Sequence, residues 1–196
     1  MIDLKTTLFI VDGPSDASSF DKKFKTLFGQ APHIYKPATN GRDVTAESYV
    51  NSIYGYLNKA LRGPFRHIIC ILDREERQPT AVEFGNSVLE EIQKQLSRKF
   101  NDDQLKKITV IVSDRCFENW IVADIEGIKN KQDLIRQDSR QDNFEGRNGA
   151  AILKKIMLGK YRKTTHADIL FNCVRFEVAR ENSTSFDRFC STINYP

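Results

Sequence analysis

The sequence has no apolar run long enough to cross a lipid bilayer, because a membrane-spanning helix needs about 20 consecutive apolar residues. It also lacks an apolar segment behind a basic start near residue 1, which is the pattern of a secretory signal. We therefore expect a cytoplasmic protein that makes no contact with a membrane.

Cysteine and histidine are scarce, with four and three residues, respectively. No two cysteines form a Cys-x-x-Cys pair, and Cys70 lies inside an apolar run that is typical of a buried thiol. We expect reduced thiols, as in an intracellular protein. The histidines have no spacing typical of a metal site, so His33, His67 and His166 are interpreted as structural.

Two signatures of phosphate chemistry are also missing. The P-loop pattern G-x-x-x-x-G-K-[ST] does not occur, so we do not expect this chain to hydrolyse ATP by itself. A receiver-type phosphoacceptor needs an acid after its third strand and a lysine after its fifth, but only four clear strands are predicted. The net charge of +4 is compatible with a nucleic-acid partner but does not indicate one.

The 196 residues are enough for one sizeable hydrophobic core. Apolar runs alternate with stretches of helical period, which predicts strands joined by crossover helices. The expected fold class is α/β, with a parallel sheet of about four strands flanked by helices. The predicted strands are 7–11, 33–36, 67–72 and 108–112, the second of them at an edge.

Three crossover helices are predicted between these strands: one capped by Ser15 and ended by Gly29, one over 47–61 and one over 80–100. After Ser113 the pattern becomes helical. Residues 1–128 are expected to form the α/β core, and 129–196 a C-terminal helical extension packed on it as one domain. Beyond the last strand, we expect an apolar helix over 116–128. We expect a mobile loop over 131–147, which has a short helix at Leu134 and acts as a lid. Two amphipathic helices over 150–161 and 166–180 and a last helix over 185–193 should follow.

Acidic residues follow three of the predicted strands: Asp12, then Asp73 with Glu75, then Asp114 and Glu118. Parallel strands end at one edge of a sheet, so these side chains should share a crevice. Gathered carboxylates repel one another unless a cation neutralises them, and Mg²⁺ prefers hard oxygen ligands. For any single acid, capping a turn is the better explanation. Their coincidence after three strands favours a metal site.

Several motifs carry a resemblance to a known fold. VDGPSD before a helix and ILDREE at the end of a later strand resemble the paired acid-Gly and D-x-D signatures of the TOPRIM fold. CFENWIVAD, GKYRKT and ARENSTSF further resemble a bacterial TOPRIM-like group known as domain of unknown function 4276, and this similarity spans nearly the whole chain. The resemblance implies a metal-dependent nuclease of phage defence that acts on DNA or RNA, including tRNA, beside a partner ATPase.

The resemblance also implies the metal ligands. Asp12 falls on the first-strand acid of the family, Asp73 and Glu75 fall on the D-x-D pair, and Glu118 falls on the acid before Trp120. These four carboxylates are therefore expected to bind Mg²⁺, with Mn²⁺ as the alternative ion, and to be catalytic. The chain departs from the family at two of them, because glutamate is usual in place of Asp12 and aspartate in place of Glu75.

Basic residues near the predicted site are candidates for phosphate binding. The similarity includes the GKYRKT segment, so Lys163 is expected to be catalytic, and Lys160, Arg162 and Arg74 to bind substrate phosphate. Arg74, which lies outside this segment, and Arg42 are weaker candidates. The competing interpretation of the segment is a solvated turn between two helices.

A non-catalytic alternative stays open at this point. A TOPRIM-like module could bind an ATPase partner or nucleic acid without cleaving it, and Mg²⁺ binding and cleavage would separate the two hypotheses. The sequence leaves open the choice between DNA and RNA, the number of metal ions, the identity of the partner and the oligomeric state.

Overall fold

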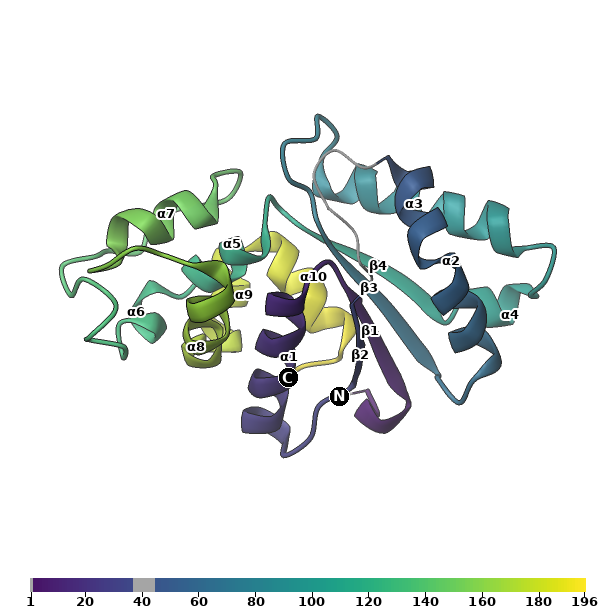
Figure 1. The fold of residues 1–196 in the computed structure, drawn as a ribbon, viewed down its shortest axis with the longest axis horizontal. Helices are drawn as coiled ribbons and strands as arrows, with labels where there is room; N and C mark the ends of the chain where they lie inside the picture. The colour runs from purple at the N-terminus through teal and green to yellow at the C-terminus, as the bar shows by residue number, and fades with distance from the viewer. Residues whose placement is uncertain (1, 37–44) are drawn as a thin grey trace.

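The computed structural model describes residues 2–36 and 45–196, so Arg42 lies outside the described residues. One parallel sheet runs through the middle of the molecule with helices on both faces (Figure 1), as predicted. Its strand order is β2-β1-β3-β4. The strands are β1 (Thr7–Val11), β2 (His33–Tyr35), β3 (His67–Asp73) and β4 (Ile108–Ser113).

Alternate residues of the central strands face different cores. Leu8 and Ile10 of β1 pack with the helices on one face, whereas Phe9 and Val11 pack with those on the other. Side chains of a strand point to opposite faces in turn, so a strand that is apolar at every position must be covered on both sides. All five residues of β1 are buried, which agrees with its continuous apolar sequence.

One face of the sheet is covered by α2 (Ala46–Arg62), α3 (Ala81–Leu96) and the short α4 (Asp102–Leu105) (Figure 1). A capping box between Thr80 and Glu83 begins α3. This helix ends at Leu96, earlier than predicted, because the chain turns over residues 97–101 into α4, where the Asn101 side chain accepts a hydrogen bond from Gln104 N.

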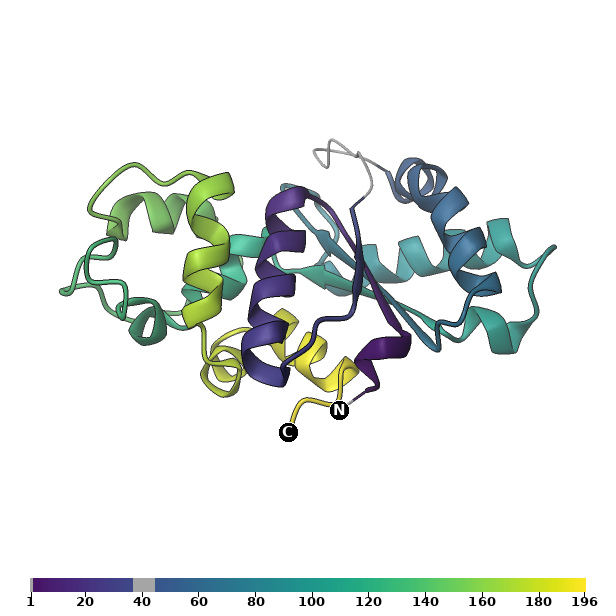
Figure 2. The ribbon, with the colours of Figure 1, turned by 60° about the horizontal axis from the view of Figure 1, so that its bottom comes forward.

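The other face is covered by α1 (Pro14–Phe28) and α10 (Thr184–Thr192). The prediction that Ser15 caps α1 was wrong: Gly13 is the N-cap and Pro14 takes the first helical position, where its missing N–H costs nothing. Gly29 ends the helix with φ 71°, as predicted. The chain ends lie close together (Figure 2), and a one-turn helix, Leu4–Thr6, precedes β1.

Five helices form a lobe beside α1 (Figures 1 and 2). Each of the helices predicted over 116–128 and 166–180 is divided into two. The buried Asp124 explains both divisions, because its carboxylate accepts hydrogen bonds from Gly127 N and from the backbone and side chain of Arg175. The five are α5 (Phe117–Val122), α6 (Ile125–Ile128), α7 (Gly149–Ile156), α8 (Lys163–Cys173) and α9 (Phe176–Asn182).

The segment 131–147 was predicted to be a mobile loop with a short helix, and in the structure it is irregular but packed. Leu134 lies in a turn rather than a helix, and Ile135 is fully buried in an isolated bridge with Met157. The Asn119 side chain donates to the carbonyl groups of Phe144 and Arg147, which holds the far end of the segment. These contacts fix the segment against the lobe.

No helix in residues 2–36 and 45–196 is long and apolar enough to cross a membrane. All four cysteines are free thiols. Cys70 on β3 is fully buried, as predicted, and burial raises the pKa of its thiol to about 12.

Candidate functional site

Four acidic side chains meet at the edge where β1, β3 and β4 end. Asp12 follows β1, Asp16 lies in the first turn of α1, Asp73 ends β3, and Glu118 lies in the first turn of α5. We refer to these four residues as the acidic cluster. The Lys163 amine lies among them, with Nζ 2.9 Å from Asp16 Oδ1, 3.8 Å from Asp73 Oδ2 and 3.8 Å from Glu118 Oε2.

Hydrogen bonds between strand ends orient two of these carboxylates. Asp12 Oδ2 accepts a hydrogen bond of 2.9 Å from the backbone N–H of Asp73, which joins the ends of β1 and β3. The Ser113 hydroxyl at the end of β4 donates to Asp73 Oδ1 at 2.9 Å. Asp73 therefore has one oxygen held by the sheet, and its other oxygen faces Lys163.

Tyr161 orients Glu118 in a similar way. The carboxylate is buried, and Tyr161 OH donates to Glu118 Oε1 at 2.9 Å, so that Oε2 is the oxygen facing the amine. Burial, together with the nearby Glu118 charge, raises the pKa of the Tyr161 hydroxyl well above its usual value. Tyr161 therefore stays a hydrogen-bond donor at neutral pH.

Burial dominates the electrostatics of the site. It raises the pKa of Asp12 to about 7 and raises the pKa values of Asp16 and Asp73, and the neighbouring acids add to these shifts while Lys163 opposes them. Burial alone would lower the pKa of Lys163, but Asp73, Asp16 and Glu118 together raise it above its ordinary value. The amine is therefore charged at neutral pH, and one cation faces several acids.

The raised pKa of Asp12 predicts a pH-dependent stability. Between its ordinary value of 3.8 and about 7, the folded state keeps a proton that the unfolded chain releases, so the free energy of unfolding should fall as pH rises through this window. Chemical denaturation in EDTA at a series of pH values measures this slope. We expect a shallower slope for Asp12→Asn, and equal slopes for the two proteins would contradict the shift.

The donor set of the cluster fits a hard divalent cation. All its ligand atoms are carboxylate oxygens, which Mg²⁺ and Mn²⁺ prefer. Asp16 Oδ1 is buried, and although the Lys163 amine lies near it, no donor among the described residues is aligned with it as a hydrogen bond. In the described ranges, no group of three or more His, Cys, Asp or Glu is arranged as a metal site.

Glu75 and Arg74 lie just beyond Asp73, in the turn that follows β3. Glu75 has φ 56°, and its N–H donates to Arg115 O at 2.6 Å. The Arg74 guanidinium donates to Asp114 O and to Arg77 O, so it is engaged with backbone carbonyl groups near the site.

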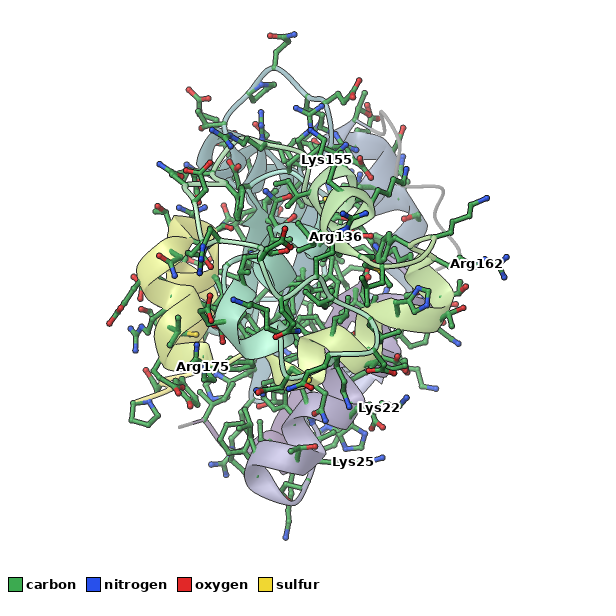
Figure 3. All side chains as sticks on the ribbon, turned by 90° about the vertical axis from the view of Figure 1, so that its left-hand side faces the viewer. Lys22, Lys25, Arg136, Lys155, Arg162 and Arg175 are labelled. Atoms are coloured by element: carbon green, nitrogen blue, oxygen red, sulfur yellow. The ribbon has the colours of Figure 1, made fainter. Side chains whose placement is uncertain are left out.

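The remaining cation candidates lie on the surface. Lys160 and Arg162 are exposed on either side of the buried Tyr161. Figure 3 shows Arg162 extending from the lobe, with Arg136 and Lys155 on the same side of the molecule. Of the basic residues in the GKYRKT segment, it is Lys163 that contacts the cluster, beside the Tyr161 hydroxyl that binds Glu118. This side of the lobe carries exposed positive charge.

Residues 11–194 match the model of a family described as domain of unknown function (DUF4276). The chain belongs to this family. Comparison with curated proteins and with solved structures found no match. The DUF4276 match begins at the last residue of β1 and ends beyond α10, so the whole acidic cluster and Lys163 lie inside it.

The sequence did not predict that three further residues, Asp16, Ser113 and Tyr161, belong to this site. Asp16 is the second acid of VDGPSD, but an acid in the first turn of a helix is also explained by the helix dipole. Ser113 was interpreted only as the end of a strand. Tyr161 stood between candidate cations, and its role depends on Glu118, which is distant in sequence.

Gly149 sets the distance between α7 and Glu118 in this structure. A Cβ at this position would lie 2.5 Å from both Asn119 N and the Glu118 carbonyl carbon, so the helix could not stay in place. We expect Gly149→Ala to lower the free energy of unfolding by about 1–3 kcal/mol.

The matched control is Gly55→Ala in the middle of α2, where nothing lies within 4 Å of the added Cβ. This variant should be more stable by about 0.5–1 kcal/mol, because alanine favours a helix over glycine. Urea denaturation measures both changes. Equal effects of the two substitutions would contradict the close packing at Gly149.

Proposed function

We propose that the protein is a metal-dependent nuclease of TOPRIM type that hydrolyses phosphodiester bonds in DNA or RNA. The observation that carries this proposal is the convergence of Asp16, Asp73 and Glu118 oxygens on one cationic amine at the carboxyl ends of the strands. Such a position attracts cations, and it lies where ligands bind to open parallel sheets.

Each residue of the site has a role in this proposal. Asp12, Asp73 and Glu118 would hold Mg²⁺ or Mn²⁺, with Asp16 beside them and Glu75 as the further candidate implied by the family resemblance. When bound, the ion would supply a Lewis acid that neutralises charge on the scissile phosphate. Lys163 keeps its proton at neutral pH and can donate a hydrogen bond to a phosphate or leaving oxygen.

The exposed cations of the lobe support a polyanionic substrate. Lys160 and Arg162 flank the residue that orients Glu118, and Arg136 and Lys155 lie on the same side (Figure 3). Phosphate groups bind to such surfaces largely through charge. The resemblance to phage-defence proteins supports a role in antiviral defence, with an ATPase as the partner.

One observation favours a second candidate, a module that binds an ATPase or nucleic acid without cleaving it. The Lys163 amine already lies where it offsets the charge of the cluster, and an amine can hold carboxylates together without a metal. The replacement of the usual acids by Asp12 and Glu75 supports the same candidate.

The two candidates predict different results with a labelled substrate. Single-stranded and duplex DNA and RNA are incubated with the protein in Mg²⁺, Mn²⁺ or EDTA, with and without an ATPase encoded beside it. We expect cleavage that depends on the metal. Products that form equally in EDTA, or no cleavage under any condition together with intact binding, would contradict the nuclease and favour the binding module.

A variant that restores glutamate, the usual acid of the family at position 12, gives a second test of catalysis at this site. Asp12→Glu lengthens the side chain by one methylene, and metal geometry is sensitive on that scale. If the site is catalytic, we expect Asp12→Glu to keep or increase the rate of cleavage measured in Mg²⁺. Complete loss of cleavage in this variant, with folding unchanged, would show that the site does not follow the pattern of the family.

A further inference from the structure

A groove lined with aromatic side chains lies between β2 and α2, outside the acidic cluster. One part has a volume of about 300 Å³ and is lined by His33, Tyr35, Tyr56, Lys59 and Phe65, among others. This volume lies at the lower end of the range for pockets that hold small ligands. A second hollow, of about 580 Å³, shares Lys59 and Phe65 with the first and adds Arg62. We call the two together the aromatic groove.

The groove exists because β2 is an edge strand. Within residues 2–36 and 45–196, it pairs with β1 alone, and His33 and Tyr35 project from the same face of it, as residues two apart in a strand do. The His33 ring meets Phe65 edge-on, with centroids 5.2 Å apart. The Tyr35 ring lies 3.7 Å from that of Tyr56, measured between centroids.

Aromatic surface remains accessible in this groove. Tyr56 is 38% exposed, although most large apolar side chains of the chain are buried. Exposed aromatic rings arranged along a groove can stack on the flat faces of nucleobases, and such stacking tolerates any sequence.

The charge of the groove indicates an anionic ligand. Among the described residues that line it, Lys59 and Arg62 are the charged side chains and none is acidic. Neither forms a salt bridge with a carboxylate in the part of the chain that the structure describes. The Arg62 guanidinium also lies 5.8 Å from the ring centroid of Phe100, a buried residue outside the groove lining.

We propose that the aromatic groove binds single-stranded nucleic acid, with bases stacked on Tyr56 and its neighbours and phosphates held by Lys59 and Arg62. The choice of nucleic acid among anionic ligands rests on the proposed function. Tyr35 pairs with Ile10, two residues before Asp12, so one end of the groove lies toward the edge of the sheet that carries the acidic cluster.

The test measures binding without cleavage. Fluorescence anisotropy follows a labelled oligothymidylate, and the matching duplex, titrated with the full chain in EDTA at low salt. The single strand should bind more tightly than the duplex. Tyr56→Leu should weaken single-strand binding about tenfold, in the range for the loss of one stacked base, whereas Tyr56→Phe, which keeps the ring, should not.

Charge variants test the phosphate contact. Lys59→Glu should weaken binding and reduce its dependence on salt. Lys25→Glu on α1 makes the same change of charge on a helix that covers the other face of the sheet, and it should have little effect. Lys59 and Lys25 are both exposed, so neither substitution should prevent folding.

The outcomes separate this inference from the proposed function. Equal affinities of wild type and Tyr56→Leu for the single strand would show that the aromatic groove does not bind it, whether or not the wild type cleaves in Mg²⁺. Loss of self-association in Tyr56→Leu, seen by sedimentation with no change in DNA affinity, would overturn it in favour of a second copy of the chain. Binding that depends on Tyr56, without cleavage that depends on metal, would contradict the proposed nuclease activity and support single-strand binding in the aromatic groove.

Discussion

Asp73→Asn should reduce the rate of Mg²⁺-dependent cleavage by about 100-fold or more. Removing one group that is held in place to stabilise the transition state typically lowers a reaction rate by this much. Asparagine nearly keeps the shape of the side chain, and its carbonyl oxygen can still accept the hydrogen bond from Ser113. The change removes one negative charge where Asp12, Asp16 and Glu118 already lie close. Cleavage rates and calorimetric titration with Mg²⁺ measure the two effects.

The fold should survive this substitution. Burial raises the pKa of Asp73 well above its usual value, so a neutral amide relieves a cost that the folded state bears, and the Tm should stay the same or rise. Asp21→Asn is the matched control, because Asp21 lies on α1 and pairs with Lys25 at the surface. If Asp73→Asn cleaves as fast as the control, the assignment of the nuclease to this site is wrong.

Lys163→Met should destabilise the protein by about 3 kcal/mol at neutral pH in EDTA, because it leaves the acidic cluster without its cation. The Lys163 side chain is 35% exposed, so we expect the lower end of the range for breaking a buried ion pair. Methionine keeps much of the apolar stem, which limits the loss of packing. Denaturant unfolding measures the change.

Mg²⁺ should reverse much of this loss, since a divalent ion can take over the neutralising role of the amine. The stabilisation should grow with ion concentration, as for any ligand that binds only the folded state. Lys160→Met removes an exposed amine from the same segment and should change stability by less than about 0.5 kcal/mol. If Mg²⁺ stabilises both variants equally, the acidic cluster does not bind the ion.

Much of the sheet could be predicted because its signals are local. Continuous apolar runs gave β1 at its observed bounds and the other strands within one residue, and Gly29 ended α1 as expected. The placement of Asp12, Asp73 and Glu118 at one edge followed from the rule that parallel strands end together. These features depend on neighbours in sequence or on a general rule of topology.

The rest depends on contacts between distant segments. Asp124 divides two predicted helices because it binds Arg175, a partner that no pattern near Asp124 reveals. The order in 131–147 comes from Asn119 and from the Ile135 bridge to Met157. The Lys163 amine likewise lies among the acids because α8 packs beside α1. The spacing of residues in the sequence does not predict this packing of the two helices.

Trp120 makes the candidate site observable by its own fluorescence. It is the only tryptophan of the chain, it is fully buried, and it lies two residues after Glu118 on α5. Its indole N–H donates to Ser185 Oγ at 2.8 Å, and the same hydroxyl accepts from the backbone N–H of Asp114. A shift of α5 or of the turn after β4 would alter the surroundings of the indole. Its emission wavelength therefore reports such movements without an attached label, and a titration with metal or nucleic acid can be followed on the unmodified protein.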